Sequence, residues 1–354
     1  MRFKLLSFAS SIALLISSCS TDFKSGADYK DVTSAFCLLS MSDTAHYVKI
    51  NKGFFSETEN NLIIAQNPDS LYFKNIEVKV EELNNGNVQK TYPLNRVDLK
   101  DEGYIKDEGT FAQNPSYAYK FKFKQGEAFN PSRTYRLVIT NLSTGRVIDA
   151  FTNVIDDAKF KIQFPLSGKD VISFADYEKP TPFSWNIPEG ASFFDLYMRF
   201  YYEEENIASG ARTREVKDLL LAKNIQIGTS NLLTSFVKSE TFYGVLNAAL
   251  PFKQDFVRYV DTPDIYIQAG GKELKTYIDV TTAQGGLTAD QIKPNYTNFR
   301  FDGQDGTGYR EVFGIFSSRA EEYVGRVPFD VKTIEELKKG KFSGNLRIVG
   351  LTSN

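Results

Sequence analysis

Short segments in which apolar and polar residues alternate recur along the chain, and they constrain its fold more than any other feature. Tyr47–Ile50, Ile76–Val80, Tyr117–Phe123 and Tyr135–Ile139 are examples. A period of two places successive side chains on opposite faces of a β-strand. Each such strand therefore buries one face and exposes the other, which is typical of antiparallel sheets packed around an apolar core.

Turn-forming residues separate these segments. Asn84–Asn87 and Ser143–Gly145 contain residues that tolerate positive φ, as tight hairpins require. About seven short strands within about 130 residues fit an immunoglobulin-like sandwich. We therefore expect a first β domain at residues 31–163.

A second domain is expected from residue 164 to residue 354. Phe164–Gly168 contains a proline, which cannot extend a central strand, followed by a glycine. The segments that favour strands in this part are Phe183–Ile187, Phe193–Tyr202, Ile265–Gln268 and Thr276–Val280.

Short helices are expected within the second domain. Ser239 is a residue type that caps helices, apolar residues then recur at helical spacing, and Pro251 ends the segment. Thr333–Lys339 favours a shorter helix. The predicted fold class is thus mainly β, with two β-sandwich domains, the second carrying one or two short helices.

The first nineteen residues form a secretory signal in three parts. Arg2 and Lys4 supply a basic start, Leu5–Ile16 is largely apolar, and small residues precede Cys19. This arrangement resembles the bacterial lipobox, which implies cleavage before Cys19 and acylation of its thiol. We therefore expect a signal peptide at 1–18, a polar tether at 19–30 and a stable lipid anchor, since two or three acyl chains hold a protein where one would not.

Composition excludes several function classes. The 42 basic and 44 acidic residues give a net charge of −2, so the chain lacks the broad positive field that nucleic-acid binding needs. One histidine and two cysteines argue against zinc sites and disulfide frameworks. We expect no cofactor, since no phosphate loop, dinucleotide fingerprint or nucleophile elbow is found. With Cys19 acylated, Cys37 is expected to be a buried free thiol.

Few residues are candidates for a catalytic or metal-binding role. His46, the single histidine, precedes a strand and is expected at its surface or end. Asp302 and Asp305 lie among glycines and are a weak calcium candidate, but a hairpin loop is favoured because the segment lacks the acidic count of a calcium loop. We expect no other metal site. Glu203–Glu205 is read as a solvated strand end rather than an acid–base pair, because successive strand residues alternate sides.

Aromatic residues are more suggestive of binding, with 29 Phe and 19 Tyr in the chain. Exposed tyrosines can stack on sugars or anchor a protein partner, whereas most aromatic residues of a sandwich fill its core. Trp185 is expected in the core. The candidates for an exposed binding platform are Tyr197, Tyr201, Tyr202, Tyr259, Tyr266 and Tyr277.

Several short sequence segments resemble those of uncharacterised outer-membrane lipoproteins of the Bacteroidota. They are His46–Lys52, Ala65–Ser70, Phe242–Tyr243, Tyr296–Asn298 and Gly314–Arg319. The resemblance implies an outer-membrane location, on either the periplasmic or the surface face, and adds no catalytic residue. Asp43–Ala45 and Asp69–Leu71 look like the acceptor of that phylum's periplasmic O-glycosylation, which implies modification at Thr44 and Ser70.

The sequence as a whole favours a lipid-anchored cell-envelope protein that binds a protein or glycan partner without catalysis. Two alternatives stay open: a carboxylate-based hydrolase acting on glycans, and a structural subunit of an outer-membrane assembly. Paired carboxylates in a pocket would favour the hydrolase, and an aromatic patch would favour binding.

Overall fold

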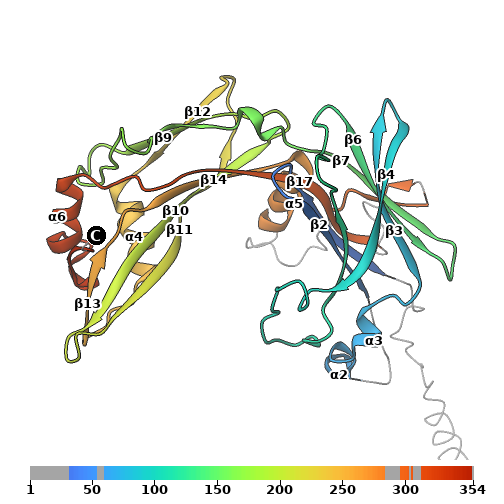
Figure 1. Cartoon of the computed structure of the whole chain (residues 1–354), viewed down its shortest axis with the longest axis horizontal. Helices are drawn as coiled ribbons and strands as arrows, with labels where there is room; N and C mark the ends of the chain where they lie inside the picture. The colour runs from blue at the N-terminus through green and yellow to red at the C-terminus, as the bar shows by residue number, and fades with distance from the viewer. Residues whose placement is uncertain (1–31, 54–59, 284–295, 303, 306–311, 353–354) are drawn as a thin grey trace, which may run out of the picture.

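Two β-rich lobes joined by a long strand give the molecule the outline of an arch (Figure 1). The structure is a computed structural model and describes residues 32–53, 60–283, 296–302, 304–305 and 312–352. Strands dominate and the helices are short, so the expected mainly β fold is confirmed. Within the described residues, no helix is both long and apolar enough to span a bilayer.

The strands of the first lobe are β1 (Thr33–Leu39), β2 (Ala45–Lys52), β3 (Ile76–Asn84), β4 (Asn87–Asp98), β5 (Tyr117–Lys122), β6 (Thr134–Asn141), β7 (Val147–Asn153), β15 (Phe299–Phe301) and β16 (Gln304–Asp305). Those of the second lobe are β8 (Ile162–Phe164), β9 (Thr181–Asn186), β10 (Phe193–Asn206), β11 (Arg212–Gln226), β12 (Leu232–Val237), β13 (Phe256–Val260), β14 (Asp264–Gly270) and β18 (Ile348–Leu351). β17 (Val312–Val324) belongs to both lobes.

The helices are α2 (Asn61–Ala65), α3 (Pro68–Leu71), α4 (Ser239–Ala249), α5 (Lys272–Ala283) and α6 (Val331–Lys339), with short 3-10 helices at η1 (Asp157–Lys159) and η2 (Gly344–Leu346). The two helices α2 and α3 lie in the first lobe, where the sequence patterns did not indicate them. Asn60 and Asn67 cap them by accepting hydrogen bonds from backbone N–H groups.

One continuous sheet runs through both lobes in the order β16-β15-β7-β6-β3-β4-β5-β2-β1-β17-β14-β10-β13-β18, with β11 paired to β10. A separate sheet has the order β12-β9-β8. In the first lobe the continuous sheet bends around a core, because β4 pairs with β3 through its first half and with β5 through its second.

The core of the first lobe is built from the alternating residues that the sequence indicated. Val48, Val80 and Leu137 are each 0 % exposed and come from three different strands. The predicted hairpin turn between β3 and β4 is present, with Asn85 and Gly86 at φ 49° and 81°. Period-two patterning therefore predicted β2, β3, β5 and β6 of this lobe, and turn chemistry predicted the β3–β4 hairpin.

The core of the second lobe lies between the β8–β9–β12 sheet and the larger sheet. Trp185 on β9 meets Phe194 on β10 with ring centroids 5.4 Å apart, and the ring centroid of Phe183 on β9 lies 6.4 Å from that of Phe174; these residues are fully buried. Helix α4 adds Phe242, which stacks on Phe174 with ring centroids 4.1 Å apart. The prediction that Trp185 is a core residue is confirmed.

Strand β17 connects the lobes by changing partners along its length. Its first half pairs parallel with β1, from Thr33↔Val312 onward, and its second half pairs antiparallel with β14. At Gly314, φ is +102° and a Cβ atom would lie 1.9 Å from the carbonyl oxygen of Ala35. Only glycine permits this approach of the two strands.

The two cores divide the chain differently from the boundary expected at residues 163 and 164. Ile155 and Phe160, which precede it, pack in the second core, while Phe299 and Phe316 pack in the first. The C-terminal part of the chain thus returns to the first lobe. Local composition does not reveal this return, because it depends on long-range strand pairing.

The strand expected at Thr276–Val280 is wrong, because these residues belong to helix α5. Leu274, Tyr277 and Ile278 lie at i, i+3 and i+4, a spacing that suits a helix face as well as a short alternating strand. Ser317 fixes the start of the helix, since its Oγ accepts a hydrogen bond from the Leu274 N–H at 3.2 Å.

The two predicted helices of the second lobe are present, with different caps. Lys238 is the N-cap of α4, and the Ser239 hydroxyl instead donates to the Asp176 carbonyl. Helix α6 begins two residues before the predicted segment, because Asp330 caps it by accepting a hydrogen bond from the Thr333 N–H at 2.7 Å.

Candidate functional site

The face of the large sheet that is turned away from the second core carries a group of tyrosines. Along β10 the even-numbered residues from Phe194 to Glu204 are buried and the odd-numbered residues from Asp195 to Glu205 are half-buried. The β8–β9–β12 sheet and α4 pack on the even side, and β9 and β12 lie above β10 and β14 in Figure 1. The opposite side carries Tyr197, Tyr201, Tyr259, Tyr266 and Tyr323, called here the tyrosine face.

Register places these rings next to one another. Tyr197 pairs with Tyr266 across β10 and β14, and Tyr266 pairs with Tyr323 across β14 and β17. The rings of Tyr266 and Tyr323 are stacked, with centroids 5.6 Å apart and planes 18° apart. Because Tyr323 is 62 % exposed, this pair presents a flat aromatic surface to solvent.

Charged side chains flank the stacked pair. The Arg199 guanidinium lies 4.7 Å from the centroid of the Tyr266 ring and donates to its hydroxyl at 3.2 Å. Arg199 also holds Asp218 with two hydrogen bonds of 2.6 and 2.9 Å. These bonds lower the pKa of Asp218 and outweigh its partial burial, so its carboxylate stays ionised near neutral pH.

Tyr201 and Asp264 form a second hydrogen-bonded group beside Arg199 and Asp218. Tyr201 donates its hydroxyl to Asp264 Oδ2 at 2.9 Å, while Asp264 Oδ1 accepts from the Arg326 N–H at 2.7 Å. Burial, followed by the bond to the Asp264 carboxylate, raises the pKa of the Tyr201 hydroxyl. The ring of Tyr201 is therefore held in one orientation, which pre-forms the surface.

The far end of the tyrosine face repeats the pattern of ring and cation. The Arg212 guanidinium lies 4.1 Å from the centroid of Tyr259 and pairs with Glu205 at 2.7 Å and Glu203 at 3.4 Å. The face thus alternates aromatic rings with oriented hydrogen-bonding groups. Such a surface suits a ligand with apolar ring faces and polar edges.

Four of the six tyrosine candidates from the sequence lie on this face. Tyr202 does not, because it points to the core and is 4 % exposed. Tyr277 lies on α5, where its ring meets Phe36 edge-on at 6.1 Å. Tyr323 was missed by the sequence analysis; alternation along β17 from the buried Ala320 would have indicated its outward orientation.

The Glu203–Glu205 segment was expected to be a solvated strand end, but its middle residue, Glu204, is buried. Glu204 is 4 % exposed, and its Oε1 accepts two hydrogen bonds from Arg258, at 3.0 and 2.9 Å. Lys253 also contacts its carboxylate. Glu204 faces the core because alternation along β10 places it on the same side as the buried even-numbered residues. There the buried guanidinium of Arg258 compensates its negative charge.

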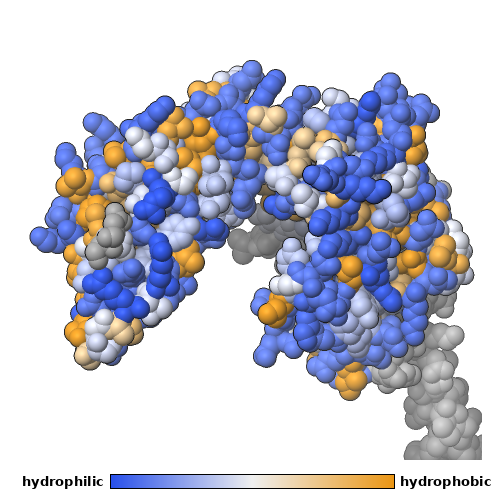
Figure 2. Space-filling view, in the orientation of Figure 1, coloured by the Kyte–Doolittle hydropathy of each residue, from blue (hydrophilic) through white to orange (hydrophobic). Residues whose placement is uncertain are grey.

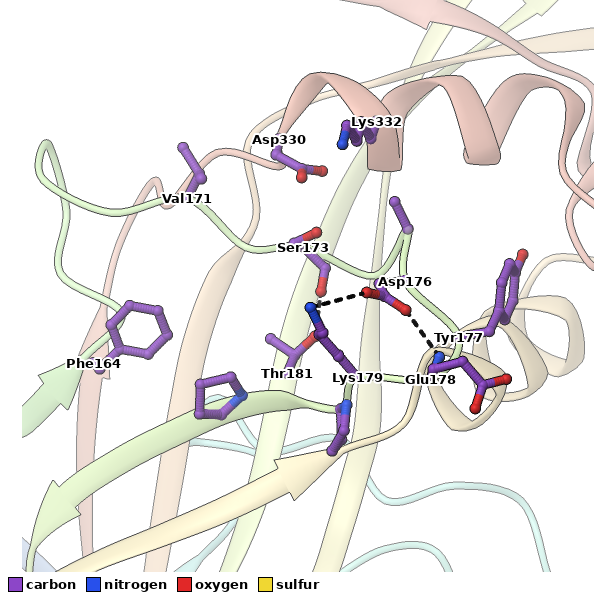
Figure 3. A pocket seen from close by; sticks show the side chains of 13 residues that line it. Phe164, Val171, Ser173, Asp176, Tyr177, Glu178, Lys179, Thr181, Asp330 and Lys332 are labelled. Atoms are coloured by element: carbon purple, nitrogen blue, oxygen red, sulfur yellow. Dashed lines mark hydrogen bonds and ion pairs between the residues drawn. The ribbon is translucent and has the colours of Figure 1, made fainter.

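A groove of about 870 Å³ opens between residues 171–182 and the start of α6. Figure 3 shows Asp330 and Lys332 on the side of α6 and Asp176 with Lys179 on the opposite loop. Asp176 accepts from the Glu178 N–H at 3.0 Å, and Asp330 caps α6. Burial opposes ionisation of Asp330, but the bonds from Thr333 outweigh it and lower its pKa. Both carboxylates therefore have structural roles.

The single histidine is not at the surface. His46 is 1 % exposed, and its ring lies 4.8, 5.3 and 4.7 Å from the centroids of Phe121, Phe123 and Phe129. Burial lowers the pKa of His46 to about 4, against the weaker opposing effect of the nearby Asp43 carboxylate. The imidazole is thus neutral and acts as a packing residue, because the second position of β2 already faces the core.

The remaining sequence candidates have simpler settings. Cys37 is a buried free cysteine, as expected, and burial raises the pKa of its thiol to about 12. Thr44 is exposed immediately before β2, and Ser70 is half-buried within α3. Cys19 lies outside the described residues.

The calcium candidates are only partly described. Asp302 is exposed in the turn between β15 and β16, and its Oδ1 accepts a hydrogen bond from the Val147 N–H at 3.0 Å. The backbone of Asp305 pairs with Arg300, while its side chain lies outside the described part. The long hairpin loop expected at residues 301–308 is only partly within the described residues and stays a prediction. Within the described residues, no group of three His, Cys, Asp or Glu side chains could hold a metal ion.

Comparison with known proteins gives structural similarity at low sequence identity and no sequence relative. No family model and no curated protein match the chain. Among solved structures, the C-terminal globular domain of the oligosaccharyltransferase from Pyrococcus abyssi is similar at 11 % identity and a TM-score of 0.23. The match covers 67 % of this chain and 47 % of that one, so the chain spans about half of the structure it matches.

Proposed function

We propose that this protein is a lipid-anchored envelope protein that binds a glycan on its tyrosine face. The observation that carries the proposal is the stacked Tyr266–Tyr323 pair, which is exposed and flanked by oriented charged groups. A sugar ring presents C–H groups on its faces and hydroxyls at its edge. The tyrosine rings would cover the C–H faces of the sugar, while Arg199 and Asp264 would form hydrogen bonds with its hydroxyls.

The chemistry of the carboxylates supports binding rather than hydrolysis. Glycoside hydrolysis needs one carboxyl group that stays protonated near neutral pH to act as an acid. Asp218, on the tyrosine face, has a lowered pKa and is held by Arg199. Asp264 is engaged by Tyr201 and by a backbone N–H. A pre-formed surface with occupied carboxylates suits recognition.

The anchor belongs to the same proposal and rests on the sequence. Residues 1–18 have the composition of a signal peptide, and Cys19 stands where acylation takes place. We place the protein in the outer membrane, on the resemblance to the Bacteroidota lipoproteins, with the folded part outside the cytoplasm. Modification at Thr44 suits this compartment, since the residue is exposed.

Two experiments test the proposal. Cys19→Ala should move the protein from the membrane to the soluble fraction, and mass spectrometry of the native chain should show an acylated Cys19 as its first residue. The purified protein should bind a subset of the glycans on an array and release no sugar from them. A stoichiometric protein companion in a detergent pull-down, with no glycan bound, would support the assembly subunit instead.

A further inference from the structure

One end of the first lobe carries several highly exposed apolar side chains. Ile105 is 90 % exposed, Ile63 69 %, Leu62 60 % and Phe111 50 %. Soluble surfaces rarely gather such residues without a partner. These four residues are called here the apolar tip.

Contacts between α2 and the loop before β5 hold the tip together. The Ala112 N–H donates to the Ala65 carbonyl at 2.9 Å, which fixes the loop against the end of α2. Lys106 donates to the Ala112 carbonyl at 2.8 Å, and its ammonium lies 5.7 Å from the centroid of the Phe111 ring. The tip is therefore a fixed surface, and Figure 2 shows apolar residues at the lower edge of this lobe, where Figure 1 places α2.

The described chain begins beside the helical part of this lobe's tip, next to the segment that follows α3. The Val32 carbonyl accepts from the Gly53 N–H at 2.7 Å, and Thr33 lines a small cavity with Phe73, which follows α3. Residues 19–31 precede this point and span at most about 45 Å when extended. A lipid at Cys19 would therefore keep this end of the lobe close to the bilayer.

We infer that the apolar tip inserts into the lipid surface to which the chain is anchored. This inference rests on the proposed acylation of Cys19. Insertion of Ile63 and Ile105 would add apolar burial to the anchor and fix the orientation of the lobe on the membrane. The tyrosine face, on the second lobe, would then be held at a constant angle to the bilayer.

The charge of the tip indicates which lipid it meets. Residues 100–111 contain two lysines and four carboxylates, so the loop gains nothing from an anionic surface. Insertion should therefore take place in a zwitterionic bilayer and be insensitive to salt, since it depends on apolar contact.

Tryptophan fluorescence of the acylated full-length chain tests the inference. Trp185 is the only native tryptophan and is fully buried, so its signal serves as a background. Ile105→Trp places a reporter in the tip. Val88→Trp is the matched control, because Val88 is 51 % exposed beside the β3–β4 hairpin, at the other end of strands about 30 Å long.

Both variants are reconstituted in phosphatidylcholine vesicles with and without brominated phosphatidylcholine. We expect the Ile105→Trp emission to shift to shorter wavelength and to be quenched by brominated lipid at least about twofold more than that of Val88→Trp, at low and high salt alike. Equal quenching in proteins that float with the vesicles would overturn the inference. Failure of both variants to float would instead overturn the anchor, which separates the two proposals.

Discussion

Arg258 and Glu204 form an ion pair inside the second lobe, with side chains only 2 % and 5 % exposed and an N–O distance of 2.9 Å. Arg258 also donates to the carbonyls of Leu346 and Pro251, at 2.9 and 2.7 Å. The pair thus ties the end of β10 to β13 and to the C-terminal segment. A buried charge whose partner is removed is left uncompensated, so the pair is a sensitive point of the lobe.

Removing one partner should destabilise the protein strongly. We expect Glu204→Ala or Arg258→Ala to lower the free energy of unfolding by about 3–5 kcal/mol, measured by urea denaturation. The double variant Glu204→Leu/Arg258→Met should recover most of this loss, because no buried charge remains. Glu203→Ala, at the surface beside it, should cost less than about 1 kcal/mol. Equal effects of Glu203→Ala and Glu204→Ala would contradict this assignment.

The same pair predicts a dependence on acid pH. Burial raises the pKa of Glu204, but the bonds from Lys253 and Arg258 outweigh it and hold the pKa below the ordinary 4.5. A lowered folded pKa gives stability that is present above pH 4.5 and is lost as the pH falls through the folded value. Lowering the pH below 4.5 should therefore reduce the urea concentration at the unfolding midpoint less in Glu204→Leu/Arg258→Met than in the native protein.

His46 predicts a separate loss of stability between pH 6.5 and pH 4. Its pKa is lowered from 6.5 to about 4 by burial, so the unfolded chain takes up a proton in this range while the folded chain does not. At pH 5 this amounts to about 2 kcal/mol. His46→Leu should remove that part of the difference between the unfolding free energies at pH 7.5 and pH 5. An unchanged difference would show that His46 is not buried, and no other histidine can mask the result.

Gly314 should tolerate no side chain. Gly314→Ala would force a Cβ atom against the Ala35 carbonyl at positive φ, and we expect a loss of at least about 3 kcal/mol of unfolding free energy or failure to fold. Gly244 is the matched control, because it lies exposed within α4 with open space around it. Gly244→Ala should stabilise the protein by about 0.5–1 kcal/mol. The thermal midpoint of each variant checks both signs.

The stacked tyrosines should be needed for glycan binding and dispensable for folding. Tyr323→Ser or Tyr266→Ser should weaken binding at least about tenfold, or about 1.4 kcal/mol, by titration calorimetry on a glycan selected from the array. Tyr104→Ser is the control, since Tyr104 is 56 % exposed on the other lobe. Unchanged affinity in both face variants would place the ligand elsewhere.

Local sequence determined much of this protein. Period two with hairpin turns predicted β2, β3, β5, β6, β9, β10 and β14, and helical spacing predicted α4 and α6, because these patterns depend on neighbours within a few residues. Aromatic content, rather than alternation, indicated Tyr197, Tyr201, Tyr259 and Tyr266 as candidates for exposure. It also grouped Tyr202 with them, although alternation places Tyr202 on the face opposite Tyr201. Periodicity misassigned α5, where a short pattern suits both periods.

Only the tertiary structure decided which faces are covered. Three contacts depend on strands that lie far apart in the chain. They are the ion pair of Glu204 with Arg258, the packing of His46 among phenylalanines and the stacking of Tyr266 on Tyr323. The return of β17 to β1 depends on pairing between residues about 280 positions apart. Composition and periodicity specify the two faces of a strand, whereas the partner on each face is set by packing of the whole chain.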